Sequence, residues 1–139
     1  MFARNRCVAC GHAIVYRVVQ SRAVLFDVEQ FLIGRINRHF DLFLDNEELW
    51  EITKRGDANI EELNPSEFDR YVFITRRFWN IEEAAFTYFS SGVLSAEAYE
   101  PWATAMCPEY AITAAQGMLE DRTVSLRRSF TDYLEKSCQ

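Results

Sequence analysis

The sharpest chemical motif in the sequence is Cys7-x-x-Cys10-x-His12, near the N-terminus. Two thiolates and an imidazole at this spacing offer three ligands to a tetrahedral zinc ion, whereas a structural zinc site needs four. No second CxxC or HxxxH motif follows, so Cys107 or Cys138 would have to supply the fourth ligand through the fold. We interpret Cys7, Cys10 and His12 as ordinary residues, keep zinc as the alternative, and expect no cofactor.

Glu82, His39 and Trp79 are the candidate residues of a binding site. Each lies within an apolar helical stripe, where a carboxylate must be paired, protonated or at the edge of the core. The simplest interpretation is that Glu82 forms an ion pair with an arginine such as Arg35 or Arg38, that His39 is a hydrogen-bonded core residue, and that Trp79 anchors the core. The alternative is a pocket between helices in which Glu82 and His39 act as base or ligands.

Motifs of the common enzyme classes are missing from the sequence. It contains no G-x-S-x-G elbow, no phosphate-binding glycine loop, no G-x-G-x-x-G and no H-E-x-x-H. Neither histidine follows a glutamate by three residues, as a di-iron bundle would require. The sequence therefore gives no specific reason to propose an enzyme.

The chain is organised around residues 66–91, which we predict to form one long helix. Asn64 and Pro65 provide start signals and Gly92 a stop signal. Apolar and aromatic residues recur within it at steps of three and four, which places a wide apolar stripe on one face of a helix. Such a stripe needs partner helices to cover it.

Apolar periodicity and capping residues predict the other helices. The first begins near His12 or Ser21 and ends at about Leu44, and a short one covers 46–56. Ser95 caps the next, in which Pro101 should cause a kink or force a later start, and a break precedes Pro108. The last two are expected at 109–119 and 125–136. The fold class is therefore all-α, an irregular bundle of five or six helices around the central helix, with a basic arm at 1–20 and one helical domain at 21–139.

Charge is distributed unevenly along the chain. The net charge is −6, but residues 1–26 carry four arginines and no acid, which leaves −10 on the remainder. An acidic body argues against nucleic acid as the main partner. The basic arm keeps contact with a membrane surface open. The four cysteines suggest no disulfide framework, so we expect a reducing, cytoplasmic location, with a peripheral membrane location as the alternative, and no transmembrane helix.

Three segments resemble an uncharacterised group of small bacterial helical proteins: DNEELWEITKRG, LNPSEFDRYVFITRRFWNIEEAAFTYFSSGVLSAEAYEPW and LRRSFTDYLE. The resemblance covers about three quarters of the chain. It implies an all-helical domain that often follows an N-terminal membrane helix, and it implies no activity or ligand. Here a shorter segment broken by charges stands where that membrane helix is expected.

These observations favour a non-enzymatic helical protein that acts through protein contacts with an unknown partner or through self-association. A small enzyme or ligand-binding protein with a pocket between helices is the alternative. An exposed apolar surface would favour the first function, and a cavity beside His39 and Glu82 would favour the second.

Overall fold

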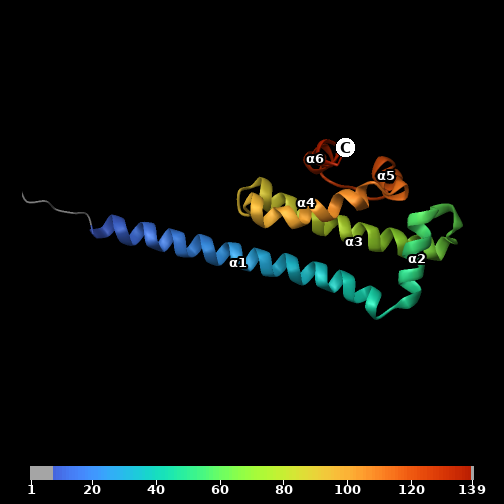
Figure 1. Cartoon of the computed structure of the whole chain (residues 1–139), viewed down its shortest axis with the longest axis horizontal. Coiled ribbons are helices and arrows are strands. Elements are labelled where there is room, and N and C mark those ends of the chain that lie inside the picture. The colour runs from blue at the N-terminus through green and yellow to red at the C-terminus, as the bar shows by residue number, and fades with distance from the viewer. Residues whose placement is uncertain (1–7, 139) are drawn as a thin grey trace, which may run out of the picture.

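The described chain is entirely helical. The structure is a computed structural model that describes the backbone of residues 8–138 and the side chains of residues 22–138. No strand occurs within 8–138, which confirms the all-α prediction. The elements, shown in Figure 1, are α1 (Val8–Leu44), α2 (Glu47–Ala58), the 3₁₀ turn η1 (Ile60–Glu62), α3 (Pro65–Ser90), α4 (Ala96–Tyr110), α5 (Thr113–Glu120) and α6 (Arg128–Ser137).

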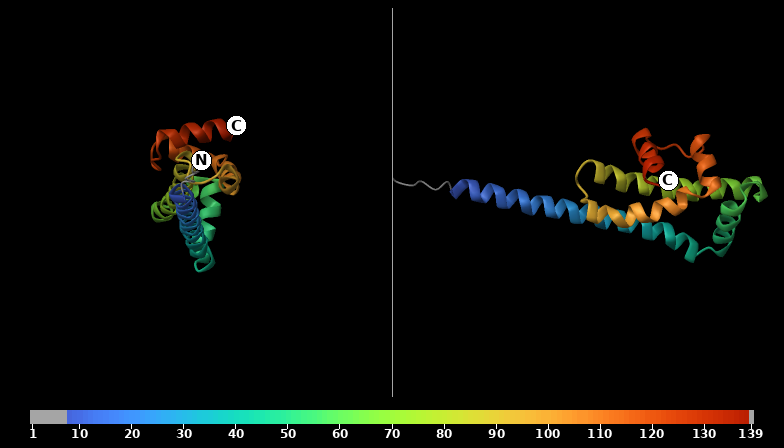
Figure 2. Two further views of the ribbon diagram at one scale, coloured as in Figure 1. Left: turned by 90° about the vertical axis from the view of Figure 1, so that its left-hand side faces the viewer. Right: turned by 45° about the horizontal axis from the view of Figure 1, so that its top comes forward.

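Helix α1 is the longest element and extends beyond the rest of the molecule. Its 37 residues span about 55 Å at 1.5 Å per residue. Only its C-terminal half lies alongside α3, and its N-terminal half projects past the other helices in Figure 1 and in the right-hand view of Figure 2. The helix ends at Leu44 as predicted, but it begins at Val8, earlier than the predicted start near His12 or Ser21.

Local capping explains where α2 and α3 begin. The Asn46 side chain accepts a hydrogen bond from the Leu49 amide at 3.0 Å. Asn64 forms a capping box with Glu67, and Pro65 occupies the first turn. After α3 the chain turns at Gly92, whose φ of 76° is favourable for glycine. The starts of both helices and the stop of α3 are as predicted, whereas α2 continues past the predicted end at Gly56 to Ala58.

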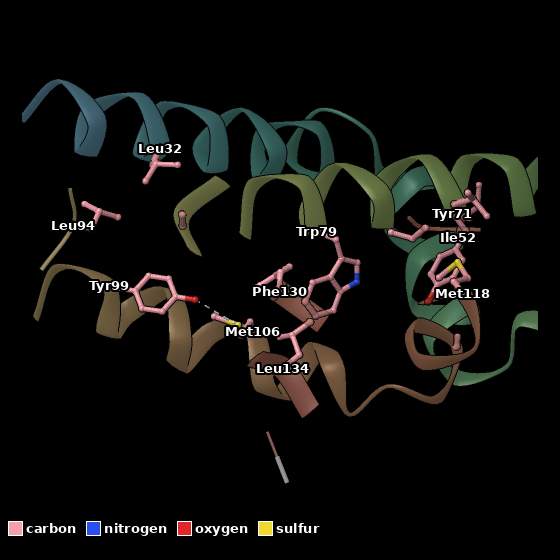
Figure 3. Packing of buried hydrophobic residues seen from close by; sticks show 14 residues of the cluster. Leu32, Ile52, Tyr71, Trp79, Leu94, Tyr99, Met106, Met118, Phe130 and Leu134 are labelled. Carbon is pink, nitrogen blue, oxygen red and sulfur yellow. Dashed lines mark hydrogen bonds between the residues drawn. The ribbon is translucent and has the colours of Figure 1, made fainter. Parts of the chain in front are cut away.

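Buried side chains of α3 belong to the core cluster of the domain. They pack against residues from α1, α2, α4, α5 and α6, and Figure 3 shows Trp79 beside Phe130 and Leu134, with Tyr71 near Ile52 and Met118. Trp79 and Tyr71 are each 1% exposed. Burial of aromatic side chains this large supplies much of the apolar area that stabilises a small domain.

Helix α4 continues through both of its prolines. The predicted break before Pro108, and with it the start of a new helix at Glu109, is wrong: α4 ends at Tyr110 and α5 begins at Thr113. Pro108 removes the donor for the carbonyl of Thr104. Thr104 is exposed, so water can hydrate that carbonyl, and only two residues of the helix follow the proline.

Helices α2 and α3 approach each other most closely at Gly56. A Cβ at this position would lie 2.5 Å from the Tyr71 ring, so only glycine fits without a shift of the neighbouring atoms. The next residue, Asp57, accepts a hydrogen bond from the Tyr71 hydroxyl at 2.7 Å. The close approach therefore places a carboxylate of α2 against the N-terminal third of α3.

A disulfide joins α4 to the C-terminal end of α6. It connects Cys107 and Cys138, which are 31 residues apart in sequence and have their Cα atoms 5.0 Å apart. The expectation of a chain without disulfides is therefore wrong. The two cysteines are remote in sequence, and only the packing of α6 against α4 brings them together.

Candidate functional site

A cavity of about 320 Å³ lies where α1, α2, α3, α4 and the start of α5 meet. Its walls are mostly apolar and aromatic, with a few polar groups among them. The residues that line it are His39, Phe40, Phe43, Trp50, Thr53, Asp57, Tyr71, Ile74, Thr75, Phe78, Trp79, Ala105, Glu109, Ile112 and Ala115. This volume is at the lower end of the range found for small-molecule sites.

His39 is the buried polar side chain of the α1 wall. It is 4% exposed, and its ring lies 5.4 Å from that of Phe43 and 5.9 Å from that of Phe78. Burial, and secondly the charge of Arg77, lower the pKa of His39 to about 4, so the imidazole is neutral at pH 7. Its Nδ1 has no hydrogen-bond partner among the described residues. The ring therefore has an unused hydrogen-bonding atom at the cavity wall.

Two carboxylates, Asp57 and Glu109, face the cavity from α2 and α4. Burial raises the pKa of Asp57, and the hydrogen bond from Tyr71 partly offsets this. Glu109 lies at the more exposed rim, where partial burial and the charge of Asp57 raise its pKa. No lysine or arginine belongs to the described lining. The two acids thus share one cavity without a counter-ion.

Two tryptophans form opposite ends of the aromatic lining. Trp79 is buried at the base and meets the Phe78 ring edge-on at 5.3 Å, as predicted for a core anchor. Trp50 is 46% exposed and contacts Phe43 edge-on at 5.5 Å, so it lies at the rim. The third tryptophan, Trp102, does not line the cavity. Aromatic faces of this kind attract cations as well as apolar groups.

Glu82 is buried in the core and does not line the cavity with His39. It is 1% exposed, and burial, followed by the charge of Glu109, raises its pKa to about 8. None of the three ion pairs among residues 22–138 involves Glu82, so the predicted pairing with Arg35 or Arg38 is wrong. Its Oε2 has no partner among the described residues. The protonated form explains how a carboxyl group lies in this core without an arginine.

The predicted metal ligands fall largely outside what the structure describes. Cys7 is outside the described residues, and so are the side chains of Cys10 and His12. Cys107 and Cys138, the suggested sources of a fourth ligand, are bonded to each other. Within the described part of the chain, no three His, Cys, Asp or Glu side chains gather as a metal site would require. Zinc binding by the N-terminal motif stays a prediction.

An exposed apolar stripe runs along α1 from the projecting half to the rim of the cavity. We call it the α1 stripe. It consists of Phe26, Ile33, Phe40 and Leu44, with exposed fractions of 60%, 44%, 52% and 84%. The first three are seven residues apart, which keeps them on one side of the helix. Phe40 is thus exposed next to the buried His39.

The sequence did not single out the cavity's two carboxylates. Asp57 was assigned to a polar connection, and Glu109 to the start of a separate helix. The only available signal was the apolar stripe of α3, which places Tyr71 toward the core but does not identify the residues that face it.

Comparisons with protein-family models, with curated proteins and with solved structures found no match to this chain. The suspected relationship to small bacterial helical proteins stays a prediction. No helix within the described residues combines the length and the apolar character needed to cross a membrane.

Proposed function

We propose that this protein is a non-enzymatic helical domain that acts through protein contacts, and that its partner is a second copy of the chain. The α1 stripe is the observation that carries the proposal. Its four large apolar side chains are left exposed by the described chain, although removing such side chains from water is favourable. Apolar residues seven positions apart are typical of helices that pair side by side.

Charge complementarity supports a second copy as the occupant. In an antiparallel pair centred near Ile33, Phe26 of each copy would lie opposite Phe40 of the other. The basic segment that precedes residue 26 would then extend toward the acidic start of α2, where Glu47 and Glu48 lie. Opposite charges at both ends of such a pair favour the antiparallel orientation over the parallel one.

The proposal also covers the place of α3 in the bundle and the role of the bundle. We infer that α3 is the centre of the bundle and that the bundle serves as a scaffold, which holds the C-terminal half of α1 and leaves its outer face free. The packing of α3 against α1, α2 and α4 supports this. Contact of residues 1–20 with a membrane surface and a cytoplasmic location are kept as proposals of lower rank. The Cys107–Cys138 disulfide weighs against a reducing compartment, on which the cytoplasmic expectation depended.

The test is the molar mass of the full chain in solution. Sedimentation equilibrium at micromolar concentration should show a monomer–dimer equilibrium for the wild-type protein. The double variant Phe26→Glu/Ile33→Glu should be monomeric, because it places four carboxylates in the paired seam. Phe73→Glu is the matched control: Phe73 is 61% exposed on α3, outside the stripe, and its replacement should leave the equilibrium unchanged.

Two outcomes would refute self-association through the stripe. One is a wild-type chain that stays monomeric throughout the concentration range. The other is dimerisation that Phe73→Glu disrupts as strongly as the double stripe variant does. Cosedimentation with anionic vesicles is run in parallel, and a monomer whose vesicle binding requires Phe26 and Ile33 would replace the proposal with a role at the membrane surface.

A further inference from the structure

We propose that the cavity among α1–α5 binds a small organic ammonium ion, with Asp57 and Glu109 as counter-ions and the aromatic side chains as walls. This inference goes beyond the proposed function and does not rest on it, although Phe40 belongs both to the α1 stripe and to the cavity lining. It assigns a ligand class to a site for which the geometry supplies charge, shape and a free hydrogen-bonding atom.

The charge argument begins with the two carboxylates that share the cavity. Two nearby basic side chains are paired with other acids: Arg55 binds Glu67 at 2.7 Å and Lys54 binds Glu51 at 2.6 Å. Arg77 is not part of the lining and donates to the backbone carbonyl of Arg38 at 3.3 Å, although its charge also acts on His39. Two acids that repel each other in a partly dry cavity are stabilised when a cation binds between them. The lining is thus complementary to positive charge.

The walls favour an organic cation over a metal ion. A bare divalent ion needs several oxygen or nitrogen ligands, and the described residues contain no group of three. The aromatic lining, including Trp79 and Phe43, instead offers the quadrupole attraction that holds alkylammonium groups. At the rim, Lys54 Nζ already lies 5.7 Å from the centroid of the Trp50 ring. Apolar side walls also accommodate the carbon substituents of such an ion.

His39 provides the second, independent observation. It is 96% buried at the cavity wall, since its exposed fraction is 4%, and its Nδ1 lacks a partner among the described residues. A neutral imidazole can accept a hydrogen bond from an ammonium N–H through one nitrogen. Because Nδ1 is itself buried, a primary amine reaches it only if the His39 ring turns toward the cavity, and the amine would then satisfy a polar atom that otherwise loses its hydration without compensation.

The position of the rim indicates how a ligand enters. Glu109 and Trp50 are partly exposed, whereas Trp79 and His39 lie deeper. A cation would first meet the carboxylate of Glu109 and then pass toward Asp57. The volume of about 320 Å³ limits the ligand to a small molecule.

The experiment uses the full chain and two cationic probes, choline and 2-phenylethylamine, each paired with a neutral analogue of similar shape, 3,3-dimethylbutan-1-ol and 2-phenylethanol. Binding is followed by titration calorimetry and by the indole N–H resonances in proton–nitrogen NMR spectra. We expect at least one amine to bind and to shift the resonances of Trp50 and Trp79. Trp102, which does not line the cavity, is the internal control.

Variants test whether the carboxylates recognise the charge. Glu109→Gln preserves shape and should weaken amine binding about tenfold or more, because it removes a charge-assisted contact. Glu100→Gln, an exposed position on the same helix, should leave it unchanged. Thermal unfolding of both variants verifies the fold, and Asp57→Asn, which keeps an acceptor for Tyr71, serves as the second test if Glu109→Gln does not fold.

Three results would overturn the proposal. The first is the failure of both cationic probes to bind. The second is equal affinity for a cationic probe and its neutral analogue, and the third is binding that shifts the resonance of Trp102 alone. Amine binding that Glu109→Gln and Glu100→Gln weaken equally would also reject it, because the attraction would then reflect the net charge of the chain and not the cavity.

Discussion

Glu82→Gln should change how the stability of the fold depends on pH. Burial raises the pKa of Glu82 from an ordinary 4.5 to about 8. Between these two pH values the folded chain keeps this proton and the unfolded chain has lost it. The free energy of unfolding therefore falls as pH rises, by about 1.4 kcal/mol for each pH unit, or roughly 5 kcal/mol across the full range.

His39 has the opposite effect on the pH dependence of the unfolding free energy over part of this range. Burial lowers its pKa from 6.5 to about 4, so at intermediate pH the unfolded chain binds a proton that the folded chain does not. Stability from this group rises with pH up to 6.5 and is constant above, a gain of roughly 3 kcal/mol. The slopes of Glu82 and His39 nearly cancel between pH 4.5 and 6.5. The loss from Glu82 should then emerge above pH 6.5 and reach about 2 kcal/mol at pH 8.

Asp57 and Glu109 contribute in the same direction as Glu82. Burial raises the pKa of each above its ordinary value, so each also favours the folded chain more at acidic pH than at neutral pH. The pKa of Glu82 is about 8, so its effect extends to pH 8. The interval from pH 6.5 to 8 is therefore the most specific window for Glu82.

The assay is urea unfolding, followed by tryptophan fluorescence at several pH values with the disulfide intact. The slope of the unfolding free energy between pH 6.5 and 8 should be clearly negative for the wild type and near zero for Glu82→Gln. Slopes are compared because the glutamine amide also needs partners, which affects absolute stability. Glu100→Gln should keep the wild-type slope. Equal slopes in the wild type and Glu82→Gln would refute the reasoning that a protonated carboxyl lies in the core.

Two further predictions concern packing and cross-linking. Gly56→Ala should lower the free energy of unfolding by about 1–3 kcal/mol, because the new methyl group would lie 2.5 Å from the Tyr71 ring. Gly117→Ala, with open space around it, should be neutral or stabilising, and equal urea midpoints for the two variants would contradict this account. Reduction of the Cys107–Cys138 disulfide, which closes a loop of 31 residues, should cost roughly 4 kcal/mol in the chain-entropy description. Unchanged thermal unfolding after verified reduction would show that the bond adds no stability.

Helix boundaries were predictable where a single short segment determines them. Asn46 and the Asn64–Pro65 pair satisfy or remove backbone donors at the starts of α2 and α3, and Gly92 supplies the turn after α3. The continuation of α4 through Pro108 was not predictable in this way. Whether a helix passes through a proline depends on the hydration of one carbonyl and on the residues that follow, which are properties of the folded molecule.

The candidate site was predictable only in part, because its residues come from distant segments. Periodicity correctly indicated that His39, Trp79 and Glu82 are buried. It could not indicate that Asp57 and Glu109, 52 positions apart in sequence, face the same space as His39. The sequence also favoured an arginine partner for Glu82, because an ionised carboxylate in the core needs one. Protonation removes that need, and the sequence does not reveal the protonation state.

The projecting half of α1 has a consequence for how the molecule moves through a liquid. A compact chain of this length has a radius of gyration of about 14 Å, whereas α1 alone is about 55 Å long. Its 37 residues make the particle rod-like at one end, which raises translational friction and slows tumbling about the short axes. A single copy would therefore elute early from a sizing column and resemble a dimer. Masses should come from equilibrium methods, which are insensitive to shape.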